Sequence, residues 1–224
     1  AYGTTGGGCN YYIGQLKVTG DLGETDTGAV SLAVTGGALR ISGNNEDGKG
    51  VALGTEVIWS PSLNGLLAIE CRLQRAVVTA GVVFIGFVNA NADDVAEPCT
   101  STGTTITAVA TNYAGFLLDS QLTATAEWHM PYLADGAAND TQTSTGVETD
   151  VNAVAGDYDI LRVEVDPDGT VRWYLNGTLE KTQASAISTT TLVAALVGCW
   201  GTTTTAASAD VQYLAIEANR DWTV

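Results

Sequence analysis

One stretch of the sequence decides the fold: residues 158–183 read YDILRVEVDPDGTVRWYLNGTLEKTQ. Its first part, ILRVEVD, alternates apolar and charged residues with the period of a strand that buries one face. Asp-Pro-Asp-Gly at 166–169 predicts a tight turn, because proline fixes φ at its second position and glycine tolerates positive φ at its last. The alternation resumes in VRWYL, and Asn-Gly at 176–177 is a strong hairpin signal. The stretch therefore predicts an antiparallel meander.

The rest of the chain supplies strands for this meander to pack against. Residues 66–74 alternate cleanly, and residues 81–88 are almost all apolar, as expected of a strand covered on both faces. Residues 89–107 lack periodicity and are predicted to form a long loop, which in a compact domain is either a functional excursion or a missed strand. Residues 135–149 are predicted to form a second polar excursion. Because helical spacing is absent, the sequence predicts an all-β sandwich with short helices or none.

Four segments resemble the concanavalin A-like jelly roll, the fold shared by legume lectins, laminin G modules and many glycoside hydrolases. They are VFIGF at 83–87, YAGFLLD at 113–119, the hairpin itself, and the chain ending around VQYL at 211–214. More narrowly, they are similar to phage-encoded jelly-roll proteins that form structural parts of the virion. The resemblance covers residues 66–221 and implies a concanavalin A-like jelly-roll sandwich of two antiparallel sheets.

Composition limits the choice of partners. The 224 residues carry 25 acidic and 9 basic side chains, a formal net charge of −16. Such a surface repels phosphate backbones and anionic lipid, so we expect neither nucleic acid nor membrane as a partner. No apolar run approaches the roughly 20 residues that a membrane span needs.

Cysteine and histidine give no basis for a metal or cofactor. Cys71 and Cys199 lie in apolar strands and are predicted to be buried, whereas Cys9 and Cys99 lie in Gly- and Thr-rich segments predicted to be loops. These two are either free thiols, the favoured interpretation, or a disulfide bridge. His129 is the only histidine, so a zinc site is not expected. Two Asp-rich loops could hold calcium, but neither has a regular calcium-loop spacing, and solvated carboxylates are favoured.

The only catalytic candidate is the acidic run EVDPD at 164–168. It resembles the alternating acidic triplet that jelly-roll glycoside hydrolases carry in their groove, and Glu164 and Asp166 share one strand face. Pro167 cannot donate within a central ladder, and the run is better explained as the turn. In the enzymes the triplet lies upstream of this hairpin, where this chain has none. We therefore predict that the protein is not an enzyme and has no catalytic residues.

The first 28 residues are rich in Gly, Thr and Asp and are predicted to form an extended N-terminal arm (1–28) ahead of the jelly-roll domain (29–224). An ordinary edge strand with a frayed terminus is the alternative interpretation. The residues expected to contact a capsid or a neighbouring subunit are Tyr11, Tyr12, Ile13, Leu16 and Trp222.

The resemblance and the missing catalytic constellation predict a structural protein of the virion, assembled in the host cytoplasm. The favoured role is a head decoration (cement) protein whose partner is the major capsid protein or a neighbouring virion subunit. The alternative is a lectin-like carbohydrate-binding module on a tail or head fibre. A glycan ligand and a homo-oligomer stay open. A lectin needs an aromatic platform on the concave sheet or its rim, whereas Trp173 and Trp200 are expected in the core.

Overall fold

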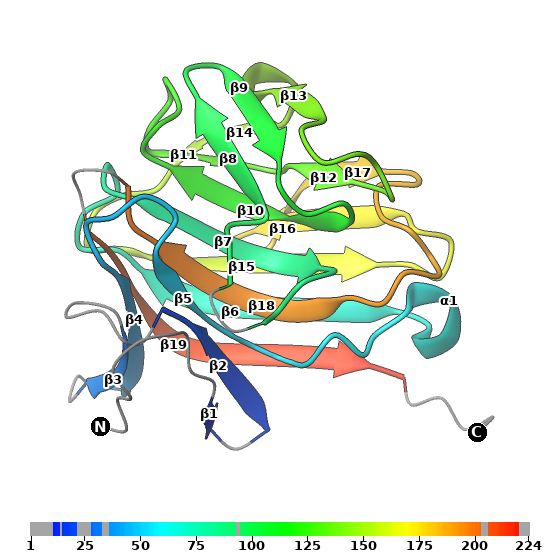
Figure 1. Cartoon of the computed structure of the whole chain (residues 1–224), viewed down its shortest axis with the longest axis horizontal. Coiled ribbons are helices and arrows are strands. Elements are labelled where there is room, and N and C mark those ends of the chain that lie inside the picture. Colours follow the sequence, from blue (N-terminus) through cyan, green and yellow to red (C-terminus); the bar gives the residue numbers. More distant parts are fainter. Residues whose placement is uncertain are drawn as a thin grey trace.

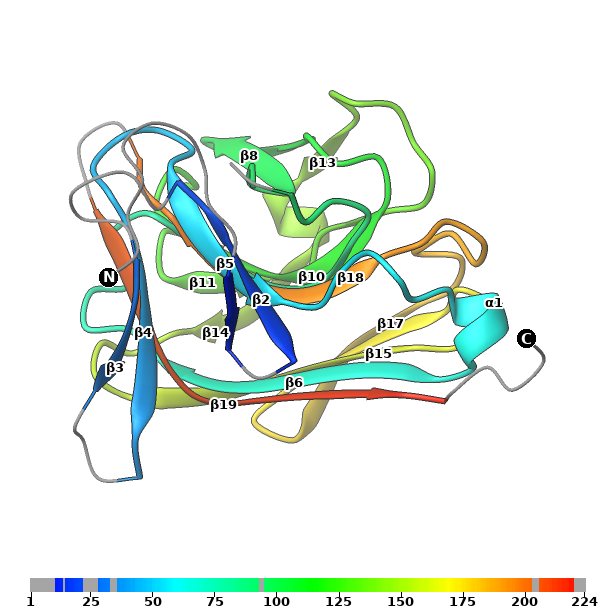
Figure 2. The same cartoon turned by 60° about the horizontal axis from the view of Figure 1, so that its bottom comes forward.

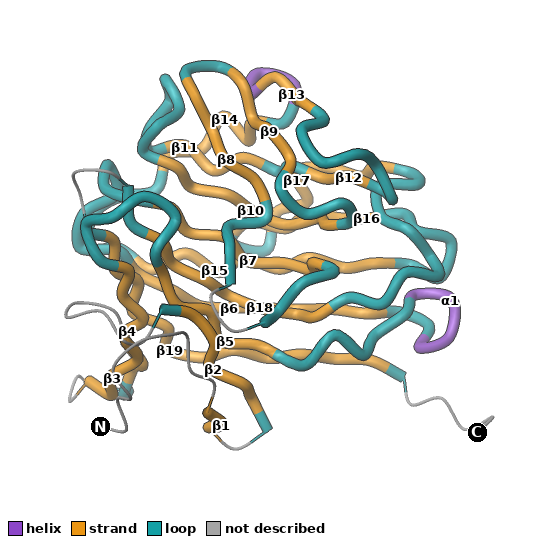
Figure 3. The backbone as a smooth tube through the Cα atoms, viewed as in Figure 1, coloured by secondary structure: helices purple, strands orange, loops and turns teal. Residues whose placement is uncertain are grey.

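The computed structural model of the chain has two large antiparallel sheets packed face to face and a third, small sheet on top of one of them (Figure 1). The structure describes residues 11–13, 15–21, 28–32, 36–92, 95–202 and 206–219. Strands dominate Figure 3, in which the helical turns are short. This architecture confirms the predicted all-β sandwich of two antiparallel sheets.

Sheet A has nine strands in the described part of the chain. In spatial order they are β1 (Tyr11–Ile13), β2 (Leu16–Gly20), β5 (Gly50–Gly54), β18 (Ala194–Trp200), β7 (Val82–Val88), β10 (Tyr113–Asp119), β11 (Glu127–His129) and β14 (Glu148–Asn152), with β12 (Tyr132–Leu133) paired to β10. Its three central strands, β18, β7 and β10, are buried along their whole length.

Sheet B has seven strands in the same part of the chain. In spatial order they are β17 (Thr178–Gln183), β16 (Val171–Leu175), β15 (Tyr158–Val165), β6 (Leu67–Gln74), β19 (Ala207–Ala218), β4 (Ala38–Gly43) and β3 (Gly28–Leu32). One turn of α-helix, α1 (Pro61–Asn64), precedes β6, and a 3-10 turn, η1 (Ser144–Gly146), precedes β14. No helix among the described residues is long and apolar enough to cross a membrane.

The predicted meander is confirmed as β15, β16 and β17. The Gly169 amide donates to the Asp166 carbonyl at 2.9 Å, and Gly169 has a φ of 81°, so the first turn depends on the glycine in the way the sequence predicts. Asn176 and Gly177 have φ values of 50° and 83°, which two-residue hairpins require and which Asn-Gly adopts readily.

The main core lies between the sheets and is lined by every second residue of the facing strands. Trp173 of β16 is fully buried there, and its indole Nε1 donates to the Gly115 carbonyl of β10 at 2.9 Å. This bond joins sheet B to the backbone of sheet A and satisfies a buried donor. Cys71 and Cys199 are buried and free, as predicted. Each large apolar side chain buried here contributes roughly 1.5–3 kcal/mol.

A second apolar core lies on the other side of sheet A, beneath a three-stranded sheet (Figure 2). Its strands are β8 (Cys99–Thr102), β9 (Thr105–Ala108) and β13 (Thr141–Thr143). We call these strands, with residues 95–98 that lead into β8, the cap. The predictions of a loop over 89–107 and of a polar excursion over 135–149 are therefore wrong where they cover these strands. Each strand is at most four residues long and rich in threonine, too short for periodicity to stand out.

We expect the cap to unfold together with the sandwich, because its inward side chains share the second core. Ile106 of β9 is fully buried, so Ile106→Ala should lower the free energy of unfolding by about 2–5 kcal/mol in chemical denaturation. Val109, which follows β9 and is 43% exposed, provides the control, and Val109→Ala should change stability by less than about 0.5 kcal/mol. Equal stability of the two variants would show that the cap is not part of the cooperative unit.

Candidate functional site

The outer face of sheet A, turned away from sheet B, is closed. The large side chains on it are fully or almost fully buried, and they are Phe84, Tyr113, Leu117, Leu196 and Trp200. The Trp200 indole donates to the Val95 carbonyl at 2.8 Å, which fixes the cap to the sheet. The predicted burial of Trp173 and Trp200 is thus confirmed, and the aromatic residues on this face lie beneath the cap rather than on a platform open to solvent.

Glycine lets the aromatic rings of this face lie directly on the sheet. A Cβ atom at Gly198 would stand 2.1 Å from the Trp200 ring, and one at Gly115 would stand 2.4 Å from the Phe84 ring. Either contact is shorter than van der Waals packing permits, so larger residues would displace the rings. The close packing of this face therefore depends on the glycines in its strands.

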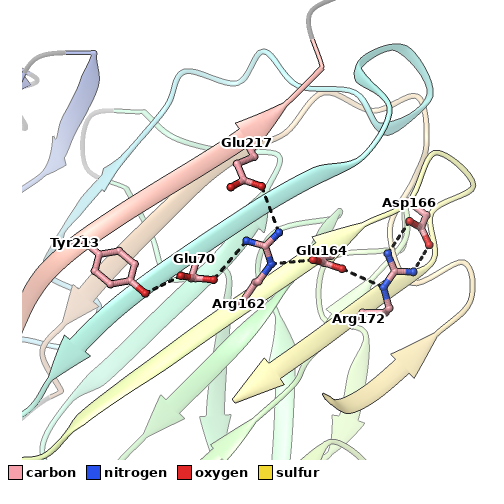
Figure 4. Close-up of polar contacts among 7 residues, drawn as sticks. All are labelled: Glu70, Arg162, Glu164, Asp166, Arg172, Tyr213 and Glu217. Atoms are coloured by element: carbon pink, nitrogen blue, oxygen red, sulfur yellow. Dashed lines mark hydrogen bonds and ion pairs between the residues drawn. The ribbon is translucent and has the colours of Figure 1, made fainter. Parts of the chain in front are cut away.

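The outer face of sheet B, by contrast, carries a network of charged side chains on neighbouring strands (Figure 4). Arg162 of β15 lies at its centre and contacts three carboxylates. Its Nε donates to Glu164 Oε1 at 2.8 Å, its Nη1 lies 3.4 Å from Glu70 Oε2, and its Nη2 lies 3.3 Å from Glu217 Oε2. One guanidinium therefore joins β15, β6 and β19.

The network extends on both sides of Arg162. The second oxygen of Glu164 accepts from Arg172 Nε at 3.2 Å, and Arg172 also forms a two-pronged contact with Asp166, of which the Nη2–Oδ1 distance is 2.8 Å. On the far side the Tyr213 hydroxyl donates to Glu70 Oε1 at 2.6 Å. Glu164 is thus held between two arginines.

Strand register explains why these residues meet. The turn at 166–169 pairs Glu164 with Arg172 across the hairpin, and β6 brings Glu70 opposite Arg162. Directly paired residues share a face of the sheet, so opposite charges at these positions face one another. The hairpin part of the network follows from the sequence and its turn, although it was not predicted. The contacts with Glu70 and Glu217 depend on strands far away in the chain, and no local signal indicates them.

The arginines set the protonation of the network. Partial burial acts to raise the pKa of Glu164, but hydrogen bonds from Arg162 and Arg172 outweigh it, and the pKa lies below its ordinary value. The hydrogen bond to Asp166 raises the pKa of Arg172. Burial and the bond to Glu70 raise the pKa of Tyr213 to about 12. Since a general acid needs a raised pKa, Glu164 is suited to binding rather than to proton donation.

A hollow of about 500 Å³ opens beside this network on the same face. It is lined by Glu70, Ile160, Arg162, Glu164, Tyr174, Asn176 and Gly177. Tyr174 stands directly across from Arg162 in the hairpin. An aromatic ring next to fixed donors and acceptors is an arrangement that binds polar ligands with apolar faces.

The residues predicted to contact a capsid lie elsewhere. Tyr11, Tyr12 and Ile13 form β1, which makes a hairpin with β2, and β2 pairs with β5 of sheet A. Leu16 begins β2 and packs against the main core. Trp222 lies outside the described residues. Because only part of the segment 1–28 is described, the boundary between arm and domain stays a prediction.

Two further predictions concern single side chains. Cys99 does not lie in a loop, as the sequence suggested, but in β8, where it is buried and free, while Cys9 lies outside the described residues. His129 is fully buried in β11, and its Nδ1 lies 3.0 Å from the Glu127 carbonyl. Burial lowers the pKa of His129, which keeps the imidazole neutral near pH 7.

Comparison with known proteins gives the fold but not a family. No family model matches the chain, and no curated protein matches it in sequence. Solved structures match nearly its whole length. The Bacillus licheniformis beta-glucanase has a TM-score of 0.56 at 15% identity, covering 97% of this chain and 100% of the glucanase. The carbohydrate recognition domain of Emp47p has a TM-score of 0.58 at 10% identity, covering 93% of this chain and 90% of that domain.

A third match is a carbohydrate esterase from the Shiga toxin-encoding bacteriophage phi24B. It has a TM-score of 0.52 at 15% identity and covers 92% of this chain and 90% of the esterase. Identities this low show the fold alone, and the same fold serves both enzymes and lectins. The chain is thus an all-β, concanavalin A-like jelly-roll sandwich, as the sequence predicted.

We expect Arg162 to stabilise sheet B, because its loss leaves three carboxylates facing one another. Arg162→Met should lower the free energy of unfolding by about 1–2 kcal/mol at low salt and by less at high salt. Glu164 has a lowered pKa, so its contribution is present above its unfolded pKa of about 4.3 and is lost as the pH falls through the folded value. The difference in the free energy of unfolding between wild type and Arg162→Met should therefore become smaller as the pH falls through this range.

Arg40 supplies the control for this experiment. It lies on β4 of the same sheet and is paired with one carboxylate, that of Asp210 on β19. Arg40→Met should cost less than about 1 kcal/mol in urea denaturation. If Arg162→Met were as stable as Arg40→Met at low salt, the network would not support the sheet.

Proposed function

We propose that this chain is a non-catalytic jelly-roll module of a virion, attached to the outer capsid surface as a decoration protein. The observation that carries the proposal is the closure of the outer face of sheet A by the cap. A chain of sugars needs an open groove with polar partners, and the outer face of sheet A is instead packed with apolar side chains beneath the cap. What remains are surfaces for contact: the edges of the sheets and the outer face of sheet B.

The charge state of the acidic residues supports the non-catalytic part. Retaining hydrolysis needs one carboxyl that is protonated near neutral pH, about 5–5.5 Å from a second. Glu164, the strongest candidate in the sequence, is bonded to two arginines that keep it ionised. It can neither donate a proton nor approach a substrate without breaking those pairs.

The association with a virion rests on two resemblances. The motifs at 83–87 and 113–119 form the adjacent central strands β7 and β10 and resemble phage-encoded structural jelly rolls. One structure of similar fold is the carbohydrate esterase of bacteriophage phi24B. A net charge of −16 suits an outward surface kept away from packaged DNA.

Attachment is proposed to use the edge of sheet A. β1, which contains Tyr11, Tyr12 and Ile13, is the terminal strand of the sheet, and among the described strands only β2 pairs with it. An unpaired strand edge is a template for strand addition by a partner chain. The partner in this proposal is the major capsid protein or a neighbouring virion subunit.

Removal of β1 should weaken attachment without unfolding the sandwich. A truncation of residues 1–13 leaves Leu16 and the rest of β2 paired with β5, so the truncated chain should keep its thermal midpoint within a few degrees. In co-sedimentation with capsids that lack this protein, we expect the full chain to bind and the truncation to bind about tenfold less. As a control, Leu179→Ala changes an exposed residue on β17, an edge strand of sheet B, and should bind normally.

The two possible failures have different meanings. Absence of binding by the full chain would refute the decoration role. Binding by the truncation that equals that of the full chain would refute only the use of β1.

A carbohydrate-binding module is the second candidate, and one observation favours it. The hollow on sheet B places Tyr174 beside the guanidinium of Arg162 and the amide of Asn176, which could stack on and hydrogen-bond a sugar. The structural match to the Emp47p carbohydrate recognition domain is consistent with this.

A glycan array and a panel of β-glucans and galactans separate the candidates. If the decoration role is right, the chain should release no reducing ends and bind no glycan. Binding that is lost in Tyr174→Ala but kept in Tyr158→Ala, a tyrosine outside the lining of the hollow, would favour the lectin role. Accumulating reducing ends that disappear in Glu164→Gln would overturn the non-catalytic proposal.

A further inference from the structure

A buried polar cluster lies where the cap meets one end of sheet A. Asp119, Val82 and Trp200 are paired across β10, β7 and β18, so their side chains stand in one row on the outer face of the sheet. The Trp200 indole holds the Val95 carbonyl above this row, and Glu97 follows two residues later. Glu97 of the cap is thereby brought close to Asp119 of the sheet.

Hydrogen-bonding atoms are left without partners in this cluster. Glu97, Ser101, Asp119 and Arg75 are 5%, 4%, 0% and 2% exposed. Unpaired are Glu97 Oε2, Ser101 Oγ, Asp119 Oδ2 and two nitrogens of Arg75, which make up five of the seven buried side-chain atoms without a partner among the described residues. Each such atom costs about 1–3 kcal/mol unless water or an ion satisfies it, so their concentration in one place makes this cluster a candidate ligand site.

Contacts on all sides show that the cluster is one site. The Gln121 amide donates to Asp119 Oδ1 at 2.8 Å, and the Ser101 hydroxyl is placed to donate to the same carboxylate. A Cβ atom at Gly48 would lie 3.8 Å from Glu97 Oε1, so the loop before β5 covers Glu97 from outside. Asp47, exposed in that loop, lies near enough to Glu97 for the two charges to interact.

The charges of the cluster do not balance. Glu97 is buried, and the carboxylates of Asp119 and Asp47 lie near it. Against these three carboxylates stands Arg75, whose guanidinium also donates to the Ala80 carbonyl. When all four groups are ionised, the cluster carries two excess negative charges in a setting where uncompensated charge is costly. Neutralisation requires protons or a cation.

We propose that this cluster binds one hard divalent cation of the calcium class, held by Glu97, Asp119 and Ser101, with the exposed carboxylate of Asp47 nearby. The three unpaired atoms that can act as ligands, Glu97 Oε2, Ser101 Oγ and Asp119 Oδ2, are oxygens, which such cations prefer, whereas the unpaired nitrogens of Arg75 are donors and take no part in holding a cation. No three Asp, Glu, His or Cys side chains in the described part of the chain are placed to hold a metal by themselves. The set is therefore completed by backbone carbonyls and water, as calcium sites accept.

The consequence is a link between three separate parts of the chain. Glu97 and Ser101 belong to the cap, Asp119 to the central strand β10, and Asp47 to the loop that precedes β5. A cation held by all three would fix the cap on sheet A. The site does not involve β1 or the hollow on sheet B, so the inference is independent of the proposed function.

Terbium luminescence tests the site, since Tb³⁺ replaces Ca²⁺ and is sensitised by nearby aromatic rings such as that of Trp200. After treatment with EDTA, the full chain should show saturable luminescence at about one ion per chain, displaced by Ca²⁺ but poorly by Mg²⁺. Ca²⁺ should also raise the thermal midpoint by several degrees. Luminescence that never saturates and a midpoint unmoved by Ca²⁺ would overturn the proposal.

Variants separate the site from general attraction to an acidic surface. Glu97→Gln and Asp119→Asn should weaken Tb³⁺ binding by about tenfold or more, while Glu180→Gln on β17 should not change it. Because the buried variants could fail to fold, the exposed Asp47→Asn supplies a third test and should bind more weakly than wild type. Equal binding by Asp47→Asn, Glu180→Gln and a folded Glu97→Gln would refute the site. A second outcome would also refute the site: wild type does not respond to Ca²⁺, and Glu97→Gln is more stable than wild type. In that case protons, and not a cation, neutralise the cluster.

Discussion

Burial of the central strands of sheet A on both faces is the constraint on which the structure depends. β7, β10 and β18 are covered by sheet B on one side and by the cap on the other, and all their residues are buried. A strand in this position must be apolar throughout, which explains the run VVFIGFV. It also needs glycine where rings lie flat on the backbone, as at Gly198 beneath Trp200. The molecule is therefore three layers deep over these strands, with one apolar core on each side of sheet A.

Because the central strands of sheet A are covered on both faces, the network of charged side chains lies on sheet B. Sheet B is covered on one face only, so its strands alternate, with apolar residues inward and charged residues outward. Because directly paired residues share a face, the outward charges of β6, β15, β16 and β19 meet and can be arranged as a network around Arg162. In this chain the open face is stabilised by ion pairs that lower the pKa of Glu164 and so make it a poor proton donor.

What the sequence could reveal depends on how local each signal is. The meander was predictable because the local sequences Asp-Pro-Asp-Gly and Asn-Gly determine its two turns, and the strand register follows from the turns. The cap was not, because strands of three or four residues carry no measurable period and derive their burial from Phe84 and Trp200, distant in the chain. The ends of the charged network at Glu70 and Glu217 are non-local for the same reason, as is the meeting of Glu97 with Asp119.

The packing of the cap on sheet A also creates the buried acidic cluster. Covering sheet A removes water from Asp119, and the covering segment brings Glu97 with it. Two carboxylates without water repel each other and lose hydration, so apolar burial around Phe84 and Tyr113 must exceed that cost, or a further group must offset it. Apolar contact is not selective, and it would be preserved if both acids were replaced by amides. The packing of the cap therefore does not require two acids at this place, and the proposed cation would offset the cost of burying them.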